Sequence, residues 1–349
     1  MTALDVRPLS PDDAPAAAEL LAAAEPLDLT GEHEDAADLA EWWGGELVDL
    51  AADGLAVVTA DGRLAGWATA IAAPGVRDAF RVSLEGRVHP GWRGRGVGSR
   101  LLDWQVRRGA EHHARRAPAA PARLVAHVHP AMAPLERLVR ARGFAAERYY
   151  AVMRRPLTGL PDVPARPDLR LVPFTDDRDD EVRRAHNAAF TRHHGSVERD
   201  PLVWRTWFTG QRAFRPDLSV LALADDAVVG YVLAYVYESD TRATGVSETR
   251  LGQIGVLPAA RGRGVATAAI AAALRAAADA GCTRAALDVD TANVTGAFAL
   301  YERVGFRTDR TWTAWARELP PLPWTTEVAT PAGRAFRRSG HFGGGGGDQ

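Results

Sequence analysis

Apolar residues come in short runs along this chain, and turn residues or longer segments of helical periodicity separate the runs. Two pairs of runs predict β-hairpins, because each pair flanks a short polar turn. The first leads from residues 55–59 through Asp61-Gly62 to residues 64–71, and the second from residues 218–223 through Asp225-Asp226 to residues 228–236. Residues 123–128 and 284–289 predict a further strand after each hairpin.

Helices are predicted between these strands. Two long ones, over residues 96–110 and 264–280, each open at a glycine-rich turn. An earlier helix starts at Ser10, where serine caps the first turn, proline fits it and Asp13 completes a capping box. Two short helices end at the glycines before Phe144 and Phe306. Strands and helices therefore mix along the whole chain, which is typical of an α/β (α+β) protein.

The same landmarks occur twice in the same order, which indicates a duplicated domain. The segment from Val88 to Gly98 corresponds to the segment from Val256 to Ala266, 168 residues further along. Other matches pair Val6-Arg7-Pro8-Leu9 with Leu171-Val172-Pro173-Phe174, Gly66-Trp67 with Gly230-Tyr231, and Gly143-Phe144 with Gly305-Phe306. We predict domains over residues 1–157 and 168–319, a proline-rich linker over 158–167, and an extension over 320–349 with a disordered glycine-rich tail.

The chemistry is expected at the turn Arg261-Gly262-Arg263-Gly264, which lies between a strand and a helix. Glycines let several backbone N–H groups face one concavity, and the following helix adds its positive dipole end. Such a turn suits a pyrophosphate, and the two arginines add positive charge. A glycine-rich turn is also found where nothing binds, so its context decides.

In this context the turn resembles the acetyl-CoA signature of the GNAT acetyltransferase superfamily, in which a Val-x-Pro strand end precedes Arg-x-x-Gly-x-Gly/Ala. The resemblance covers nearly the whole chain. The segments from Met153 to Leu157 and from Asn187 to Phe190 look similar to mycothiol synthases and related actinobacterial tandem proteins. The resemblance implies two tandem GNAT domains, each a mixed, mostly antiparallel sheet flanked by helices.

The resemblance further implies an N-acetyltransferase that uses acetyl-CoA or another acyl-CoA, needs no metal, and acts on a small-molecule amine by direct attack. Chemistry is expected in the C-terminal domain, with Tyr301 as the acid that protonates the departing thiolate. Tyr301 also fits an apolar helix stripe with Ala297 and Phe298, so a packing role stays open. The residues expected to bind the cofactor are Ile254, Gly255, Val256, Leu257, Arg261, Gly262, Arg263, Gly264, Val265, Ala266, Thr267 and Asn293 in this domain, and Val88, Arg93, Gly94, Arg95, Gly96, Val97 and Gly98 in the N-terminal one.

The resemblance also implies a general base on the fourth strand of the repeated unit, the strand that ends at the Val-x-Pro before the turn, and Glu248 is the candidate. Mycothiol synthases, by the resemblance, place a carboxylate where this chain has Arg250, so mycothiol synthesis itself is in doubt. An exposed structural role for Glu248 stays open, as does a water relay from Gln253. Glu238, Asp288 and Asp290 are weaker candidates.

The N-terminal domain has Ala131 and Val139 where the other has Asn293 and Tyr301, so it is expected to be degenerate and supportive. A net charge of −2 and the absence of a basic stripe argue against nucleic acid as a partner. One cysteine, no signal peptide and no membrane span predict a cytoplasmic protein, as a monomer or homodimer. A non-catalytic acyl-CoA-binding or regulatory protein and a protein N-acetyltransferase remain alternatives.

Overall fold

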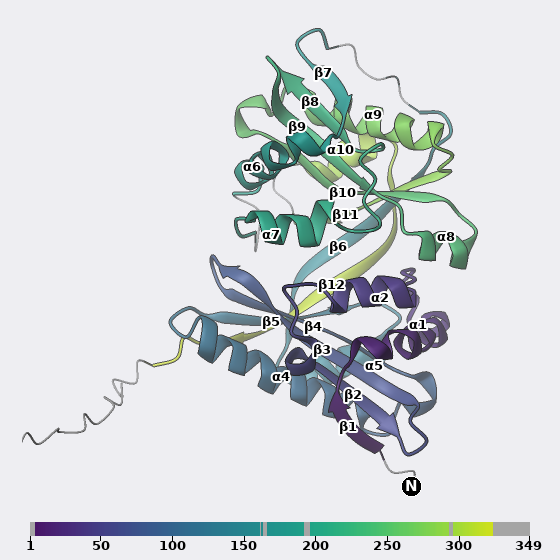
Figure 1. Cartoon of the computed structure of the whole chain (residues 1–349), viewed down its shortest axis with the longest axis vertical. Coiled ribbons are helices and arrows are strands. Elements are labelled where there is room, and N and C mark those ends of the chain that lie inside the picture. The colour runs from purple at the N-terminus through teal and green to yellow at the C-terminus, as the bar shows by residue number, and fades with distance from the viewer. Residues whose placement is uncertain (1–3, 161, 163–165, 192–195, 293–295, 324–349) are drawn as a thin grey trace, which may run out of the picture.

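The computed structural model describes residues 4–160, 162, 166–191, 196–292 and 296–323. The glycine-rich tail lies outside these residues. Within the described residues one twelve-stranded sheet is formed, in the order β1-β2-β3-β4-β5-β12-β6-β11-β10-β9-β8-β7. Figure 1 shows the two ends of this sheet as separate lobes, each with its own helices. We call β1 to β5 and their helices the N-terminal half, and β7 to β11 and theirs the C-terminal half.

The N-terminal half contains the strands β1 (Leu4–Pro8), β2 (Gly54–Thr59), β3 (Leu64–Val76), β4 (Phe80–Val88) and β5 (Ala122–Val128), the helices α1 (Ala14–Asp28), α2 (Ala36–Trp43), α3 (Leu50–Asp53), α4 (Val97–Arg116) and α5 (Ala133–Ala141), and the short turns η1 (Pro11–Asp13) and η2 (Pro90–Trp92).

The C-terminal half contains the strands β7 (Arg170–Pro173), β8 (Val220–Ala224), β9 (Ala227–Tyr235), β10 (Glu248–Val256) and β11 (Arg284–Asp290), the helices α6 (Asp179–Ala189), α7 (Pro201–Trp204), α8 (Glu238–Thr244), α9 (Val265–Asp279) and α10 (Ala297–Arg303), the short turns η3 (Asp176–Arg178) and η5 (Pro258–Ala260), and the π-helical segment η4 (Arg205–Thr209).

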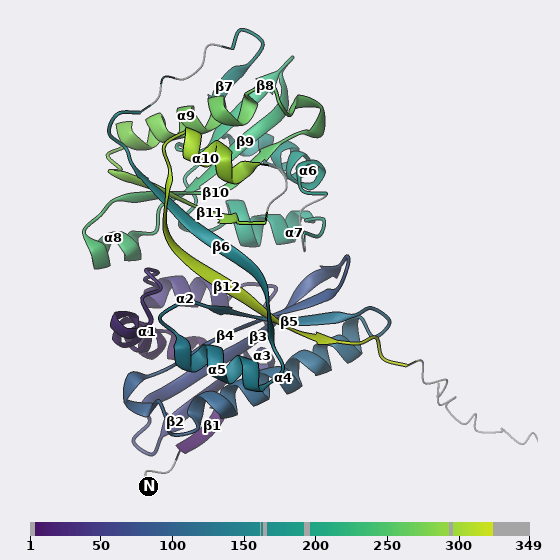
Figure 2. The same ribbon diagram turned by 180° about the vertical axis from the view of Figure 1, so that it is seen from behind.

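Two long strands, β6 (Ala145–Pro156) and β12 (Arg307–Leu319), join the halves and are exchanged between them. β6 pairs antiparallel with β11, from Tyr150↔Asp290 to Pro156↔Arg284. β12 pairs antiparallel with β5, from Thr313↔Val128 to Leu319↔Ala122. Figures 1 and 2 show both strands crossing from one lobe to the other. A cut between the predicted domains would therefore remove one sheet strand from each half.

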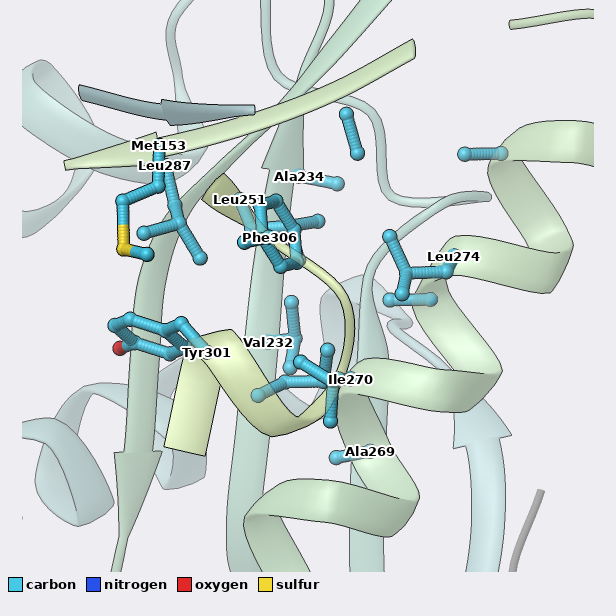
Figure 3. Packing of buried hydrophobic residues seen from close by; sticks show 14 of the residues in the cluster. Met153, Val232, Ala234, Leu251, Ala269, Ile270, Leu274, Leu287, Tyr301 and Phe306 are labelled. Carbon is cyan, nitrogen blue, oxygen red and sulfur yellow. The ribbon is translucent and has the colours of Figure 1, made fainter. Parts of the chain in front are cut away.

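The exchange also places side chains of each strand in the core of the other half. Met153 of β6 is fully buried in the C-terminal core, together with residues of β9, α9 and α10 (Figure 3). Trp315 of β12 is 4% exposed and belongs to the N-terminal core formed by β4, β5, α4 and α5. Burial of large apolar side chains drives folding, so the two halves stabilise each other directly.

Helices cover both faces of the sheet in each half. In the N-terminal half, α1 and α2 pack on one face, around Trp43 and Trp67, and α4 and α5 pack on the other. In the C-terminal half, α6 and α7 pack on one face, and α9 and α10 on the other. The sequence prediction of two mixed α/β units with flanking helices is confirmed by this arrangement.

The local signals predicted from the sequence are found where expected. Both hairpins form, as β2–β3 and β8–β9, and are antiparallel. Asp225 and Asp226 have φ of 47° and 65°, as a tight two-residue hairpin turn requires. Ser10 and Asp13 form the predicted capping box. Every helix that the structure describes is too short or too polar to cross a membrane.

Candidate functional site

The two glycine-rich turns have the same conformation at the ends of β4 and β10. Gly94 and Gly96 have φ of 73° and 84°, and Gly262 and Gly264 have φ of 73° and 78°. Glycine adopts this left-handed region without the steric penalty of other residues. A helix follows each turn directly, α4 at Val97 and α9 at Val265. The unpaired N–H groups and positive dipole of a helix start suit a phosphate group, so both turns fit the predicted pyrophosphate.

The first arginine of each turn holds the turn in place. Arg93 donates from Nε to the Val88 carbonyl, and Arg261 donates in the same way to the Val256 carbonyl, both at 3.2 Å. The terminal nitrogens of Arg93 then reach the Asp28 carboxylate at the end of α1. In Arg261 a single terminal nitrogen, Nη2, donates to the Ala189 carbonyl instead. Arg93 and Arg261, which were predicted to supply charge to a ligand, therefore also hold the fold together at the turn.

A cavity of about 770 Å³ lies at the turn of the N-terminal half and passes through the sheet. The pairing of β4 with β5 ends at Leu84↔Ala126, although β4 continues to Val88. Beyond that pair the cavity is lined from both faces of the sheet. Neighbouring residues of a strand face opposite sides, so Leu84 faces α4 and α5, and Glu85 faces α1 and α2.

The two ends of the cavity differ in chemistry. At the α4 and α5 face the lining includes the polar Ser99 and Gln105 of α4 but is mostly made of glycines and apolar side chains: Gly94, Gly96, Gly98, Leu101, Leu102, Met132, Leu135, Leu138 and Val139. Its lining at the α1 and α2 face carries charge and hydrogen-bonding groups: Asp28, Glu32, Glu34, Glu85, Arg87 and His127. One end therefore suits a long, largely apolar arm with a phosphate, and the other suits a polar small molecule.

Three carboxylates at the polar end have raised pKa values. The side chain of Glu34 is exposed, but the walls of the cavity around it desolvate the carboxylate and raise its pKa to about 8, and the charges of Glu85 and Glu32 act in the same direction. Burial also raises the pKa of Glu85, against the attraction of Arg87. The pKa of Glu32 is raised by burial as well, although Arg250 opposes it. A carboxylate with a raised pKa is a stronger base, which is what proton transfer from an amine requires.

Two histidines of the cavity wall are neutral at physiological pH. Burial lowers the pKa of both His127 and His129 to about 4, and Arg87 acts in the same direction. The ring of His127 packs on Trp312 with the centroids 4.6 Å apart. Among the described residues no group of three metal-ligating side chains comes together. These histidines thus add hydrogen-bonding groups to the cavity without adding positive charge.

Tyr301, the predicted acid, lies on α10 inside the core of the C-terminal half. The residue is 8% exposed, and burial raises the pKa of its hydroxyl to about 12. Figure 3 shows its ring beside Met153 and Leu287. The ring of Phe306 contacts it edge-on, with the centroids 6.4 Å apart. These contacts agree with the packing role that the apolar stripe leaves open, and the catalytic role stays a prediction.

Glu248, the predicted base, is the first residue of β10 and is paired with two arginines. Arg154 donates to it at 2.8 Å, and Arg284 forms a second, shorter bond. Its register partner on β11 is Arg284, and the pairing of these strands ends at Arg250↔Ala286. Glu248 therefore lies on the closed side of that strand opening. The residue is buried, not exposed, its carboxylate is engaged by two arginines, and its catalytic role stays a prediction.

The other predicted cofactor residues of the C-terminal half occupy the strand end, the turn and the helix start. Ile254 and Gly255 pair with Val232 and Tyr231 of β9, and the Leu257 N–H donates to the Val229 carbonyl. Arg263 pairs with Asp168 at 3.3 Å. Asn293 lies outside the described residues. Binding by this set is untested by the structure.

From the sequence, Glu32 and Glu34 could be named as candidates for lining an acceptor pocket, without a role, whereas Glu85 was missed. Glu85 stands on the fourth strand, 168 residues before Gln253, so the repeat offset and the expected base position together could have indicated it. Glu32 and Glu34 belong to the segment between α1 and α2, which carries no repeat landmark. Their approach to Glu85 depends on the path of that segment over the sheet, and only the tertiary structure gives it.

Comparison with known proteins identifies relatives of both halves. The profile of the Acetyltransferase (GNAT) family matches residues 16–144 and 180–306. A mycothiol acetyltransferase of Nocardia farcinica is 31% identical over 307 residues, which cover 85% of this chain and 92% of that protein. One of Thermobispora bispora is 36% identical over 230 residues, covering 63% and 70%.

Solved structures share the fold over most of the chain. A GCN5-related N-acetyltransferase from Sphaerobacter thermophilus superposes with a TM-score of 0.71 at 25% identity, over 92% of this chain and 97% of that one. A tandem GNAT protein from the clavulanic acid biosynthesis pathway superposes with a TM-score of 0.66 at 21% identity, over 92% and 100%. The second likeness concerns the fold alone.

Proposed function

The chain belongs to the GNAT acetyltransferase family and is an N-acetyltransferase, and we propose that it acetylates a primary amine of a small molecule from acetyl-CoA in the cavity of the N-terminal half. The proposal rests on one observation. The cavity joins the pyrophosphate turn on one face of the sheet to Glu85 on the other, through the opening between β4 and β5. Cofactor and acceptor can therefore meet from opposite sides. This location differs from the C-terminal site expected from the sequence.

The residues at the apolar end fit the cofactor. Added Cβ atoms at Gly94 and Gly96 meet nothing within 4 Å, so the space in front of the turn is open. Leu102, Leu138 and Val139 supply apolar surface beside it. The N–H groups at the start of α4 would hold the pyrophosphate, and these side chains would line the pantetheine arm. Acetyl-CoA supplies an activated thioester.

Glu85 is our candidate for the general base. It follows the last β4–β5 pair and faces the side from which the amine arrives. The amine nitrogen forms a bond to the acetyl carbon, the carbon–sulfur bond breaks, and the proton lost by the nitrogen goes to the Glu85 carboxylate. The sulfur leaves as a thiolate, a weaker base than the amine. Position 139 holds valine, so helix α5 offers no tyrosine acid there.

The cofactor site is tested by a matched pair of substitutions, Gly96→Glu and Gly264→Glu. Both glycines begin a helix with nearly equal φ and ψ, 84° and −5° against 78° and 8°, so the backbone strain is comparable. We expect Gly96→Glu to abolish acetyl-CoA binding in calorimetry, because it puts an anion where the pyrophosphate lies. Loss on Gly264→Glu with retention on Gly96→Glu would place the cofactor in the C-terminal half.

The base is tested by turnover, measured as release of the CoA thiol in a panel of primary amines. We expect Glu85→Gln to lower kcat by about 10²-fold or more, the usual contribution of a general base. Tyr301→Phe, which keeps the ring and its packing, should leave kcat nearly unchanged. The reverse result would support Tyr301 as the acid and reject the site proposed here.

A further inference from the structure

The C-terminal half supplies part of the wall of the N-terminal cavity. Tyr237 and Asp240 come from the start of α8, Arg250 from β10, and Trp312 from β12. All four stand at the polar end of the cavity. There the charge of Arg250 acts to lower the pKa of Glu32, and the charges of Glu32 and Glu34 act to raise the pKa of Tyr237. The acceptor end of the cavity is therefore incomplete without the second half.

The segment that carries Glu32 and Glu34 is also held by the C-terminal half. The backbone N–H of His33 donates to Oδ1 of Asp240 at 2.9 Å, and the His33 ring bonds to the same oxygen through Nδ1 at 3.0 Å. His33 lies between Glu32 and Glu34 in the chain. The Asp240 carboxylate therefore holds the backbone that carries both glutamates. Both partners are mostly buried, with side chains 25% and 20% exposed.

A second contact fixes the same segment from β12. Arg310 donates to the Thr30 carbonyl, and its guanidinium lies where a Cβ of residue 31 would stand. Residue 31 is glycine with a φ of 66°, so it meets both the steric and the backbone requirement. Within the N-terminal half, Glu25 accepts from the N–H groups of Thr30 and Gly31. The segment is thus held at its start and its middle.

Resting on the proposed function, we propose that the C-terminal half serves the reaction of the N-terminal half as its acceptor-binding wall. Tyr237 and Arg250 contact the acceptor, and Asp240 is a positioning residue that acts through His33 on Glu32 and Glu34. Arg250 is paired with Asp288 through Nη1, so the wall offers the Tyr237 hydroxyl and the remaining guanidinium N–H groups opposite carboxylates. Such a lining suits an amine that also bears hydroxyl or carbonyl groups, and an alkyl amine lacks the groups that would pair with it.

The inference is tested on the full-length protein with ethanolamine, glucosamine and n-butylamine as acceptors. We expect turnover of a hydroxyl-bearing amine and a clearly lower kcat/KM for n-butylamine. Asp240→Ala and His33→Ala should each raise KM for the preferred amine about tenfold and leave the calorimetric Kd for acetyl-CoA unchanged. Asp240→Asn should recover part of the affinity, because its amide oxygen still accepts from the His33 N–H.

A double variant and a control separate positioning from general damage to the fold. The variant with both Asp240→Ala and His33→Ala should bind the amine no worse than either single variant, because the two residues act through one contact. Glu238→Ala is the control, since this glutamate lies on the same helix with its side chain 81% exposed. It should leave KM at the value of the unaltered protein.

The experiments distinguish a failure of this inference from a failure of the proposed function. An unchanged amine KM in Asp240→Ala, together with the loss of turnover in Glu85→Gln, would overturn this inference and retain the proposed function. A change of the acetyl-CoA Kd equal to the change of KM would also overturn it, since it would indicate a general distortion. Full turnover in Glu85→Gln, or no turnover of any of the three amines, would overturn the proposed function and the inference with it.

Discussion

Arg93 and Asp28 form a two-pronged ion pair in which both terminal nitrogens of the guanidinium meet the carboxylate oxygens at 2.8 Å. Asp28 is the last residue of α1 and is 5% exposed, whereas Arg93 opens the glycine-rich turn. The pair therefore joins the helix on the acceptor face to the turn expected to hold the pyrophosphate. Because planar pairs of this kind have fixed geometry, a change in one element is passed to the other.

Asp28→Asn should weaken acetyl-CoA binding about tenfold, which corresponds to about 1.4 kcal/mol. The amide accepts only one of the two hydrogen bonds and leaves the arginine partly unpaired, so the turn loses its support. Isothermal calorimetry measures the change in Kd. Asp103→Asn is the control, because Asp103 also pairs with an arginine of the same half, Arg142 at 3.0 Å, away from the turn. An equal loss in both variants would reject a specific role of the pair.

Glu34→Gln should change how the stability depends on pH. The pKa of Glu34 is about 8 in the folded protein, against an ordinary value of 4.5. Between these pH values the folded protein keeps a proton that the unfolded chain releases, so stability falls as pH rises. Glutamine has no such proton. The variant should therefore gain Tm over the unaltered protein at pH 8 to 9, and this gain should vanish near pH 4.5.

The measurement is thermal unfolding at a series of pH values, with Glu136→Gln as the control. Glu136 lies on α5 and pairs with Arg140 on the surface, with its side chain 40% exposed. Its substitution should give the same small offset throughout the range. A Glu34→Gln variant whose offset is equally constant would contradict the raised pKa.

Trp315→Ala should lower the free energy of unfolding by about 3–5 kcal/mol, the usual cost of truncating a buried tryptophan. Trp315 comes from β12, the last strand that the structure describes, but fills the N-terminal core. Urea unfolding followed by circular dichroism measures the loss. Glu318→Ala on the same strand is the control, because its side chain is 74% exposed. A loss below about 1 kcal/mol would argue against the exchange of β12.

The sequence by itself determined the repeated unit. The hairpin signals, the capping box at Ser10 and the glycines at 96 and 264 depend on neighbours in the chain. Local rules of backbone geometry and periodicity therefore identify them correctly. The duplicated landmarks gave the GNAT family for both halves in the same way, because the turn and the strand before it lie within one short segment.

Only the tertiary structure determined which distant segments of the chain are neighbours in space. The exchange of β6 and β12 cannot be recognised from the local sequence, because the residue pattern of a strand is the same whichever sheet it joins. Tyr301 stands where the resemblance predicts an acid, but Met153, from a strand far away in the sequence, forms part of its surroundings. Glu85, His33 and Asp240 meet around one cavity because the segment after α1 is held by the other half. Contacts between distant segments are set by packing and burial, and sequence spacing does not encode them.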